Sequence, residues 1–501
     1  MWTTAADPMD RTFETSRKEP RAKSNASTIP VMKRIGFAVA FMGVFMSALD
    51  SRILIVSIPT IVADLSADTA TVVWVSVSYQ LVLTIFLSSA GRIGDLYGRK
   101  RIFDYGFLLF IVGSALSALA QNGLQLASFR VVQGLGGAIL VATSTAMITD
   151  LTPKQKLGRM LGIRSAIWAS AAMAGPVLGG LLVATLGWRS IFYVNIPVGG
   201  LALLLSRWKL RDTNPGHTTH RFDILGALTF SVSLTAFLLV LTLGADLGWN
   251  SPSVLGLITT SVIAGTAFAL LEFRHSMPMI DPRLFKIKSF SVANLAALVH
   301  SIAMFMFIFL IVFFLQLVLG YDVGTVGLVL FTIWISTSLS APVSGWLSDR
   351  FGSAPIATTG LIIKAAVLIQ LVNLDVGADL TYLVSLLFIM GIGSGLFFPP
   401  NTRAVMSSAP GDKRGIASGV LTTMQNMGIA ISLPLGVAIL ATVIPYPTLT
   451  EILQSGVGIG DPALSNLFRA GLSRVFFLGS LMMLLAAGST LFSGFRTNRT
   501  K

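Results

Sequence analysis

Residues 90–103 read Ala-Gly-Arg-Ile-Gly-Asp-Leu-Tyr-Gly-Arg-Lys-Arg-Ile-Phe, a charged turn between two long apolar segments. A reduced copy, Gly-Trp-Leu-Ser-Asp-Arg-Phe-Gly, occupies residues 345–352, again between two apolar segments. Gly91, Asp95 and Gly98 each have an identical residue 254 positions later. Two copies at one spacing, each flanked by membrane-length apolar runs, indicate a duplicated membrane architecture.

The composition is that of an integral membrane protein. Of 501 residues, 53% are hydrophobic and 12% are charged, whereas soluble proteins carry about 25% charged residues. The apolar runs are about 20 residues long, which predicts spanning helices rather than the alternating strands of a barrel. The expected fold class is therefore an all-α membrane protein. Cysteine is absent, so disulfides and thiolate metal sites are excluded, and we expect no metal or cofactor.

About fourteen spans are expected along the chain. They cover about 35–63, 71–92, 102–121, 124–148, 160–185, 188–207, 222–244, 253–273, 289–319, 323–346, 354–373, 380–402, 414–445 and 472–494. The duplication extends beyond the charged turn, because Gly134, Gly136, Gly162 and Gly179 each recur 257 positions later. These matches pair the fourth and fifth spans with the twelfth and thirteenth. Two six-span halves therefore repeat in parallel, and the seventh and eighth spans are an insert.

The predicted domain organisation follows from this repeat. We expect a disordered tail at 1–32, a six-helix bundle at 33–207, a linker with two extra spans at 208–288, a second six-helix bundle at 289–494 and a tail at 495–501.

The charged residues of the loops predict the orientation. Lysines and arginines gather in the loops on one side of the membrane, as in 99–101, 154–159, 207–211, 283–288 and 413–414. The opposite loops hold mostly acidic residues, among them Asp64, Asp68, Asp322 and Asp379. The positive-inside rule then places both termini in the cytoplasm of a multi-pass protein of the plasma or inner membrane. It also accounts for the net charge of +14 without a nucleic-acid partner.

Four motifs together resemble the major facilitator superfamily, over essentially the whole chain after residue 32. The first is the Gly-x-x-x-Asp-x-x-Gly-Arg turn after the second span. Residues 130–137 (Arg-Val-Val-Gln-Gly-Leu-Gly-Gly) look like the superfamily's fourth-span arginine motif, and residues 175–180 (Gly-Pro-Val-Leu-Gly-Gly) look like its fifth-span antiporter motif. Residues 187–199 (Gly-Trp-Arg-Ser-Ile-Phe-Tyr-Val-Asn-Ile-Pro-Val-Gly) are similar to the sixth-span signature of the fourteen-span drug:proton antiporters.

The match to that family has gaps. The antiporter motif has another glycine four residues before Gly175, where this chain has Ala171. The first-span pattern begins Leu-Asp, as Leu49-Asp50 does here, but the family then has a threonine and an asparagine where this chain has Arg52 and Ile55.

Asp50 and Arg130 are the expected proton-coupling residues. Asp50 lies deep in the first span, and a carboxylate at that depth costs a few kcal/mol unless it faces a partner or a polar space. Arginine does not lose its proton under ordinary conditions, so Arg130 is expected to tune a carboxylate, Asp50 by preference. A static ion pair is the structural alternative.

Other polar residues of the spans are candidate cavity residues. By family analogy the ninth and twelfth spans line the substrate cavity, and their polar residues are Asn294, His300 and Asn401. Gln133 and Arg52 of the first half are further candidates to line it. Arg52 is about 200° around the helix from Asp50, so it is expected to face a neighbouring helix. We expect Lys364, on a span at the bundle's periphery, to snorkel.

Two motifs are expected to serve conformational change. By resemblance, the charged turn latches the cytoplasmic side and breaks as the transporter switches; its residues are Gly91, Asp95, Gly98 and Arg99, with Asp349 and Arg350 as a weaker second latch. In the antiporter motif, Pro176 favours a kink and Gly175, Gly179 and Gly180 permit close helix packing. A topogenic loop and a generic kink are the structural alternatives.

The resemblance implies a proton-coupled secondary transporter that exports small amphipathic compounds, as in multidrug efflux, by alternating access and as a monomer. An organic-anion or metabolite carrier, including a symporter, is the alternative within transport, since three arginines and one aspartate lie deep in the spans. A membrane sensor on a transporter scaffold is the alternative of another class. An enzyme is disfavoured, because the four histidines and scattered carboxylates form no catalytic or metal spacing, and no nucleotide-binding loop is present.

Overall fold

The computed structural model describes residues 28–153, 156–210, 223–275, 278–374, 379–410, 413–454 and 461–494. Among these residues, fourteen helices are long and apolar enough to cross a membrane, which confirms the all-α membrane fold expected from the sequence. The predicted disordered tail falls largely on residues outside this description, although helix α1 already begins at Thr28. Residues 495–501, the second predicted tail, lie outside it as well.

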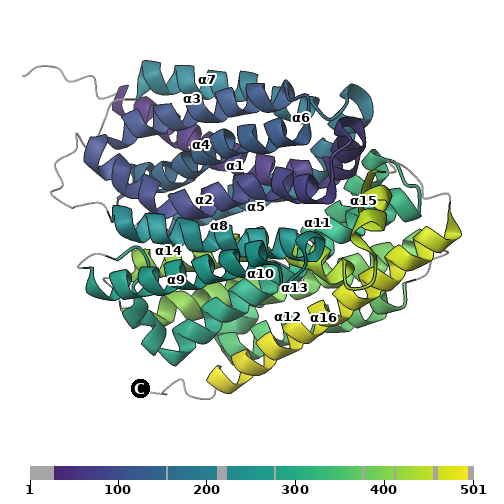
Figure 1. Ribbon diagram of the computed structural model, residues 1–501. Coiled ribbons are helices and arrows are strands. Elements are labelled where there is room, and N and C mark those ends of the chain that lie inside the picture. Colours follow the sequence, from purple (N-terminus) through teal and green to yellow (C-terminus); the bar gives the residue numbers. More distant parts are fainter. Residues whose placement is uncertain are drawn as a thin grey trace, which may run out of the picture.

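The first half comprises α1 to α7, and the second half comprises α10 to α16 (Figure 1). The first-half helices are α1 (Thr28–Leu65), α2 (Thr69–Tyr97), α3 (Arg99–Ala118), α4 (Gly123–Leu151), α5 (Leu157–Leu186), α6 (Ser190–Tyr193) and α7 (Asn195–Lys209). The second-half helices are α10 (Lys288–Phe313) with the π-helical turn η3 (Phe314–Val318), α11 (Val323–Phe351), α12 (Ser353–Val372), α13 (Leu380–Ser408), α14 (Arg414–Leu440), the short α15 (Tyr446–Gln454) and α16 (Pro462–Gly494).

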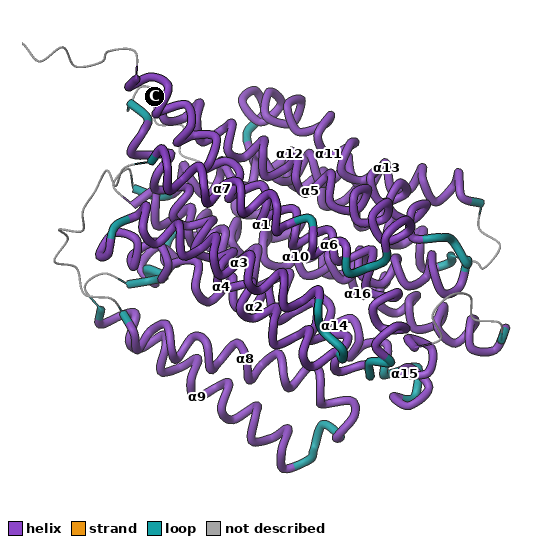
Figure 2. The backbone as a smooth tube through the Cα atoms, turned by 90° about the horizontal axis from the view of Figure 1, so that it is seen from above, coloured by secondary structure: helices purple, strands orange, loops and turns teal. Residues whose placement is uncertain are grey.

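The insert consists of α8 (Ile224–Leu247) and α9 (Pro252–Arg274), followed by the short 3-10 helix η2 (Pro282–Lys286). Helices α8 and α9 lie side by side at the edge of the two halves (Figure 2). Helix α8 packs against α2 of the first half and α14 of the second. The insert therefore covers one side of the seam between the halves.

Acidic residues begin several helices at one end of the molecule. Asp68 accepts a hydrogen bond from the Thr71 amide at the start of α2 (3.0 Å), and Asp322 accepts one from the Thr325 amide at the start of α11 (3.0 Å). Such caps satisfy amide groups that the helix leaves unpaired. We call this end the acidic end. The opposite end, where α1 begins and α16 ends (Figure 1), is called the basic end.

The two halves are joined by hydrogen bonds toward the acidic end. Gln454 of α15 donates to the Ala67 carbonyl (3.1 Å), and the Thr69 and Thr450 hydroxyls lie 2.8 Å apart. Gln316 in η3 donates to the Val56 carbonyl on α1 (2.8 Å). Together with the packing of α5 on α11, these contacts hold the acidic end closed.

Space remains beside the helices toward the basic end. A Cβ atom placed on Gly162 of α5, or on Gly415 or Gly419 of α14, would meet no atom within 4 Å. Gly162 lies 18 residues, or five helical turns, before Gly180, so the two share one face of α5. Gly180 packs against α11 of the second half. That face of α5 is therefore in contact with the second half near the acidic end and free of it near the basic end.

One ion pair near the basic end gives a pH-dependent contribution to stability. Asp281, before η2, accepts hydrogen bonds from Lys413 Nζ (2.8 Å) and the Arg283 amide (3.0 Å). Burial works to raise the pKa of Asp281, but these hydrogen bonds outweigh it, so the pKa lies below its ordinary value. The stabilisation is present above the unfolded pKa of about 3.9 and is lost as the pH falls through the folded pKa.

We expect Asp281→Asn to lower the free energy of unfolding by about 1 kcal/mol at pH 7, and we expect this difference to shrink as the pH falls through the folded pKa of Asp281, which lies below its ordinary value. Thermal unfolding of the purified protein over a series of decreasing pH values measures this. The matched control is Asp349→Asn, because Asp349 pairs with Arg403 but its side chain is 72% exposed. A difference between wild type and Asp281→Asn that stayed constant as the pH falls below the unfolded pKa would contradict the assignment.

Candidate functional site

A buried ion pair lies in the middle of the first half. Arg130 of α4 donates from Nη1 to Oδ2 of Asp50 on α1. Both side chains are almost fully buried, at 2% and 1% exposure. The ion pair fits both the expected tuning of Asp50 by Arg130 and the alternative of a static pair, and the cost of each buried charge is offset by its partner.

Three further polar residues complete the surroundings of the carboxylate. Gln133 donates to Asp50 Oδ1 (2.8 Å) and accepts from Arg130 Nη1 (2.7 Å). Asn195, the first residue of α7, also donates to Asp50 Oδ1 (3.0 Å). Gln133 and Asn195 both donate to the Ser114 hydroxyl of α3, at 2.6 and 3.1 Å. We call these five residues the Asp50 network. It joins α1, α3, α4 and α7.

An aromatic ring supports Arg130 from the side of α2. The guanidinium carbon lies 4.3 Å from the centre of the Tyr79 ring, and the Tyr79 hydroxyl lies 2.9 Å from that of Ser47. A cavity of about 20 Å³ between the halves is lined by Tyr79 and Arg130 on one side and by Phe309 and Ile429 on the other. Such a volume holds about one water molecule. The Asp50 network thus adjoins the interface between the halves.

Arg52 faces the other half of the protein. Its guanidinium carbon lies 4.1 Å from the ring centre of Phe305 on α10, 5.5 Å from Trp168 on α5 and 5.8 Å from Trp334 on α11. The side chain is 3% exposed, and the salt bridges of the described residues include none with Arg52. Asp50 and Arg52 point in opposite directions, as expected, but Asp50 faces the interior of its own half and Arg52 faces the interface. We call Arg52 and these three rings the Arg52 cage.

The candidate cavity residues are divided between the halves. Gln133 belongs to the Asp50 network, whereas Asn294, His300 and Asn401 are buried within the second half. Asn294 donates to the Phe290 carbonyl (2.9 Å), and His300 stacks on Phe397 with ring centres 4.4 Å apart. The structure therefore does not bring these three residues to Arg52 or to Asp50.

The expectation for Lys364 is wrong. Its side chain is fully buried, and Nζ lies 2.5 Å from His300 Nε2 and 3.0 Å from Ser394 Oγ. A snorkelling lysine would expose its ammonium group at the membrane surface. Lys364 instead points inward because α12 packs against both α13 and α16.

The charged turn forms an ion-pair chain within the first half. Gly98 has φ = +95°, a backbone conformation that glycine adopts without strain, and this allows α3 to begin directly after α2. Arg99 donates to Asp95 (2.7 Å) and also pairs with Asp150 at the end of α4. Gly91 lies close to α4, since an added Cβ would be 3.9 Å from Ala142. The turn thus fixes α2, α3 and α4 to one another at the basic end.

The second copy of the turn carries a weaker version of these contacts. Gly352 has φ = +89°, and Asp349 pairs with Arg403 of α13 at an exposed position. Arg350 lies over the Phe351 ring, 5.6 Å from its centre.

The glycines of the antiporter motif bring three helices together. A Cβ atom on Gly175 would lie 2.6 Å from the Cβ of Arg52, and one on Gly179 would lie 2.6 Å from the Ile53 carbonyl oxygen. On the other face, a Cβ atom on Gly180 would lie 2.7 Å from the Val323 carbonyl oxygen of α11. Pro176 lies inside α5, which continues to Leu186. Helix α5 therefore packs on both α1 and α11 through this motif.

Sequence reasoning missed Ser114, Asn195 and Tyr79 as parts of the site. Asn195 stands in the sixth-span signature, and a polar residue in the middle of a span was the available signal for the others. Among the described residues, no group of three histidines and carboxylates is placed to hold a metal ion.

The chain is similar to known transport proteins over most of its length. A family model described as "Major Facilitator Superfamily" matches residues 40–268 and 293–449. The riboflavin transporter RibZ of Clostridioides difficile (strain 630) is 32% identical over 399 residues, covering 80% of this chain and 86% of that protein. Multidrug resistance protein Stp of Mycobacterium tuberculosis (strain CDC 1551 / Oshkosh) is 33% identical over 404 residues, covering 80% and 74%.

A solved structure shares the fold. It is a bacterial homologue of the human lysosomal transporter Spinster, described as inward-facing and unoccupied, with a TM-score of 0.65 at 14% identity over 93% of this chain and 97% of that one. The family model matches well over half of the residues, in both halves of the repeat. The chain therefore belongs to the major facilitator superfamily.

Proposed function

We propose that this protein is a proton-coupled transporter that exports small amphipathic compounds by alternating access. The observation that carries the proposal is the Asp50 network, a single carboxylate held by one arginine and two amides in the interior of the first half. An ion pair at that depth is costly to build. That cost has a function if Asp50 exchanges a proton during the transport cycle.

Protonation of Asp50 would change the interactions of the whole network. The carboxylate accepts from Arg130, Gln133 and Asn195, and the protonated acid would leave Arg130 without its ionic partner. The loss of that pairing changes the relative free energies of two conformations of the first half. Proton binding is thereby coupled to the rearrangement that opens one end and closes the other.

The basic end is proposed to face the cytoplasm, with both termini there, in the cell membrane. The acidic end is closed and the basic end is free of contacts at Gly162, Gly415 and Gly419, so the conformation described is open toward the cytoplasm. In this state an exporter takes up its substrate from inside the cell. We propose that the protein works as a monomer, since each copy contains both halves of the repeat.

The Arg52 cage supports a preference for neutral or anionic substrates with an aromatic ring. A guanidinium beside three rings offers a positive charge and apolar faces together, and Arg52 has no acidic partner in the part of the chain described. Cationic drugs would instead need a carboxylate at this position. The names of the relatives, which include multidrug and riboflavin transporters, are consistent with an aromatic organic substrate.

The experiment that tests transport uses proteoliposomes with an imposed proton gradient. Cationic, neutral and anionic aromatic solutes are added, and their flux is compared with flux in the absence of a gradient and in protein-free vesicles. We expect gradient-dependent flux for at least one solute class. Equal solute flux with and without the gradient would contradict proton coupling.

Arg52→Met is expected to reduce the transport of anionic aromatic solutes by about tenfold to a hundredfold, which corresponds to the 1.5–3 kcal/mol of a hydrogen bond to a charged group. Neutral solutes should change much less. Competition against a fluorescent solute measures the effect, and Arg189→Met is the matched control, because Arg189 lies at the acidic end in an exposed pair with Asp64. Strong competition by lipophilic cations, with none by organic anions, would contradict the assignment.

A further inference from the structure

The second half contains a pair of basic side chains that the Asp50 network does not use. Lys364 Nζ on α12 lies 2.5 Å from His300 Nε2 on α10 and 3.0 Å from the Ser394 hydroxyl on α13. Lys364 and His300 are both fully buried. Helices α10, α12 and α13 occupy in the second half the places that α1, α3 and α4 occupy in the first. Each half therefore holds one buried polar cluster at the same junction of its helices.

The geometry limits how many protons the pair can hold. Ser394 donates to the Met390 carbonyl (3.2 Å), so its oxygen accepts from Lys364. An ammonium facing an imidazolium would place two donors against each other at 2.5 Å. The Lys364–His300 pair is therefore either neutral or carries one added proton and a single positive charge. His300 Nδ1 is buried without a hydrogen-bond partner among the described residues.

No carboxylate faces this pair from the helices packed around it. The described charged residues of α10, α11, α13, α14 and α16 lie toward the helix ends: Lys288, Asp349, Arg350, Arg403, Arg414, Arg469 and Arg474. Helix α1 also packs on α10, but its Asp50 is held within the first half and its Arg52 lies against Phe305. A charge without a counter-ion in the membrane interior is expensive. The neutral form is therefore favoured in this conformation, and water or a counter-ion that reaches the cluster would favour the protonated form.

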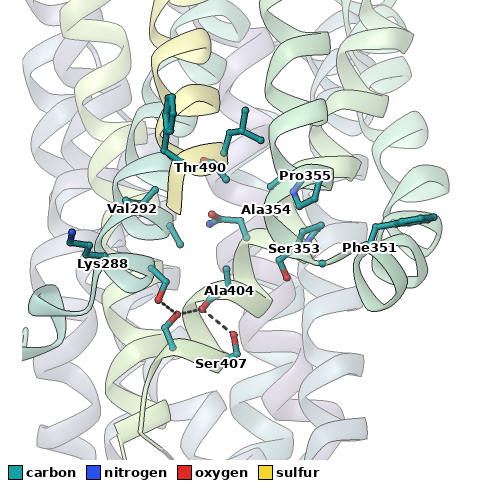
Figure 3. Close-up of a pocket in the computed structure, with 18 residues that line it drawn as sticks. Lys288, Val292, Phe351, Ser353, Ala354, Pro355, Ala404, Ser407 and Thr490 are labelled. Carbon is teal, nitrogen blue, oxygen red and sulfur yellow. Dashed lines mark hydrogen bonds between the residues drawn. The ribbon is translucent and has the colours of Figure 1, made fainter. Parts of the chain in front are cut away.

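A cavity at the basic end approaches the pair. A cavity of about 710 Å³ opens there between α10, α12, α13 and α16 (Figure 3). Its lining includes Ala293 of α10, Ala357 of α12 and Asn401 of α13. Each of them lies about two helical turns, or about 10 Å, from the cluster residue on the same helix, which is His300, Lys364 or Ser394, respectively. Asn401 Oδ1 and Asn294 Oδ1 are buried without partners among the described residues and can accept from water. We call this cavity the vestibule.

We propose that Lys364 and His300 form a second proton-binding site, which exchanges its proton with the cytoplasm through the vestibule. The inference rests on the proposed function, since it adds a second proton to a proton-coupled cycle. The proton binds to a free nitrogen lone pair of the cluster and leaves to water in the vestibule. Asp50 makes transport depend on protons, and the Lys364 site sets how many protons move per substrate.

The test measures the number of protons exchanged per solute. Proteoliposomes are clamped at zero membrane potential with a proton gradient of one pH unit, and the steady-state ratio of solute concentrations is measured. Each coupled proton multiplies that ratio tenfold. We expect Lys364→Met to retain solute transport but to reach a ratio about tenfold lower than wild type. A folded and active Lys364→Met protein that reaches the wild-type solute ratio would overturn the inference. A solute ratio in wild-type protein that does not change with the proton gradient would overturn the proposed function itself.

A second measurement does not depend on transport or on the folding of a Lys364 variant. The natural chain contains no cysteine, so a single introduced cysteine reports on one position. Asn401→Cys and Ala357→Cys should react with a hydrophilic thiol reagent added from the basic end. Ala365→Cys, at a fully buried position next to Lys364, is the matched control and should not react. Failure of both vestibule cysteines to react would remove the route for the proton and overturn the inference.

Discussion

Replacing Arg130 by leucine is expected to lower the free energy of unfolding by about 3–5 kcal/mol and to stop proton-driven transport. The variant leaves Asp50 buried without its ionic partner in the interior of the first half. Removing one member of a buried pair costs more than removing both, because the remaining charge is uncompensated. Chemical unfolding in detergent and gradient-driven flux in proteoliposomes measure the two effects.

The double variant Asp50→Asn with Arg130→Leu separates stability from transport. It removes both charges, so we expect it to recover much of the stability lost in Arg130→Leu while transport stays lost. Arg189→Leu is the control for an ion pair at the surface, where about 1 kcal/mol or less is expected. An Arg130→Leu protein as stable as wild type would show that Asp50 is not left as an uncompensated buried charge when Arg130 is removed.

Gly162→Trp is expected to reduce transport at least tenfold with little change in stability. Gly162 has open space beside it in this conformation, so a large side chain is accommodated. It shares a face of α5 with Gly180, which packs on the second half. When the basic end closes, this face must approach the second half along more of its length. An indole at Gly162 would block that closure, and the transport rate together with thermal unfolding measures the outcome.

Two glycines provide the controls for Gly162→Trp. Gly256 on α9 also has open space beside it but lies in the insert, so Gly256→Trp should leave both transport and stability unchanged. Gly180→Trp should destabilise the present conformation, because even a Cβ atom there would lie 2.7 Å from the Val323 carbonyl oxygen. Wild-type transport by Gly162→Trp would mean that α5 does not approach the second half during the cycle.

The fold was predictable because a membrane leaves few alternatives. A helix that crosses the hydrocarbon core needs about 20 apolar residues, so the spans are visible in the sequence, and the repeated spacing of Gly91 and Asp95 reveals the two halves. Superfamily membership assigns the chain to transport rather than to enzymatic catalysis. The short helix α15 was not expected, since it does not cross the membrane and lies outside the repeat.

The site was predictable only where a charge in a span demanded a partner. Asp50 and Arg130 could be matched because each is costly alone. Asn195 and Ser114 are neutral, and nothing in their linear spacing shows that they meet at one carboxylate. The direction of Lys364 was misjudged because spans that are apolar on all sides carry no periodic signal of which face is buried.

In the proposed function, Asp50 carries a proton whose movement is coupled to that of the substrate. The most direct test encloses a pH-sensitive dye in proteoliposomes and adds a transported solute to wild type and to Asp50→Asn. Asparagine keeps the size of the side chain and one acceptor oxygen, but it cannot bind and release a proton. We predict solute-triggered proton movement in wild type and none in Asp50→Asn. Proton movement of wild-type size in Asp50→Asn would contradict the account and place the coupling elsewhere.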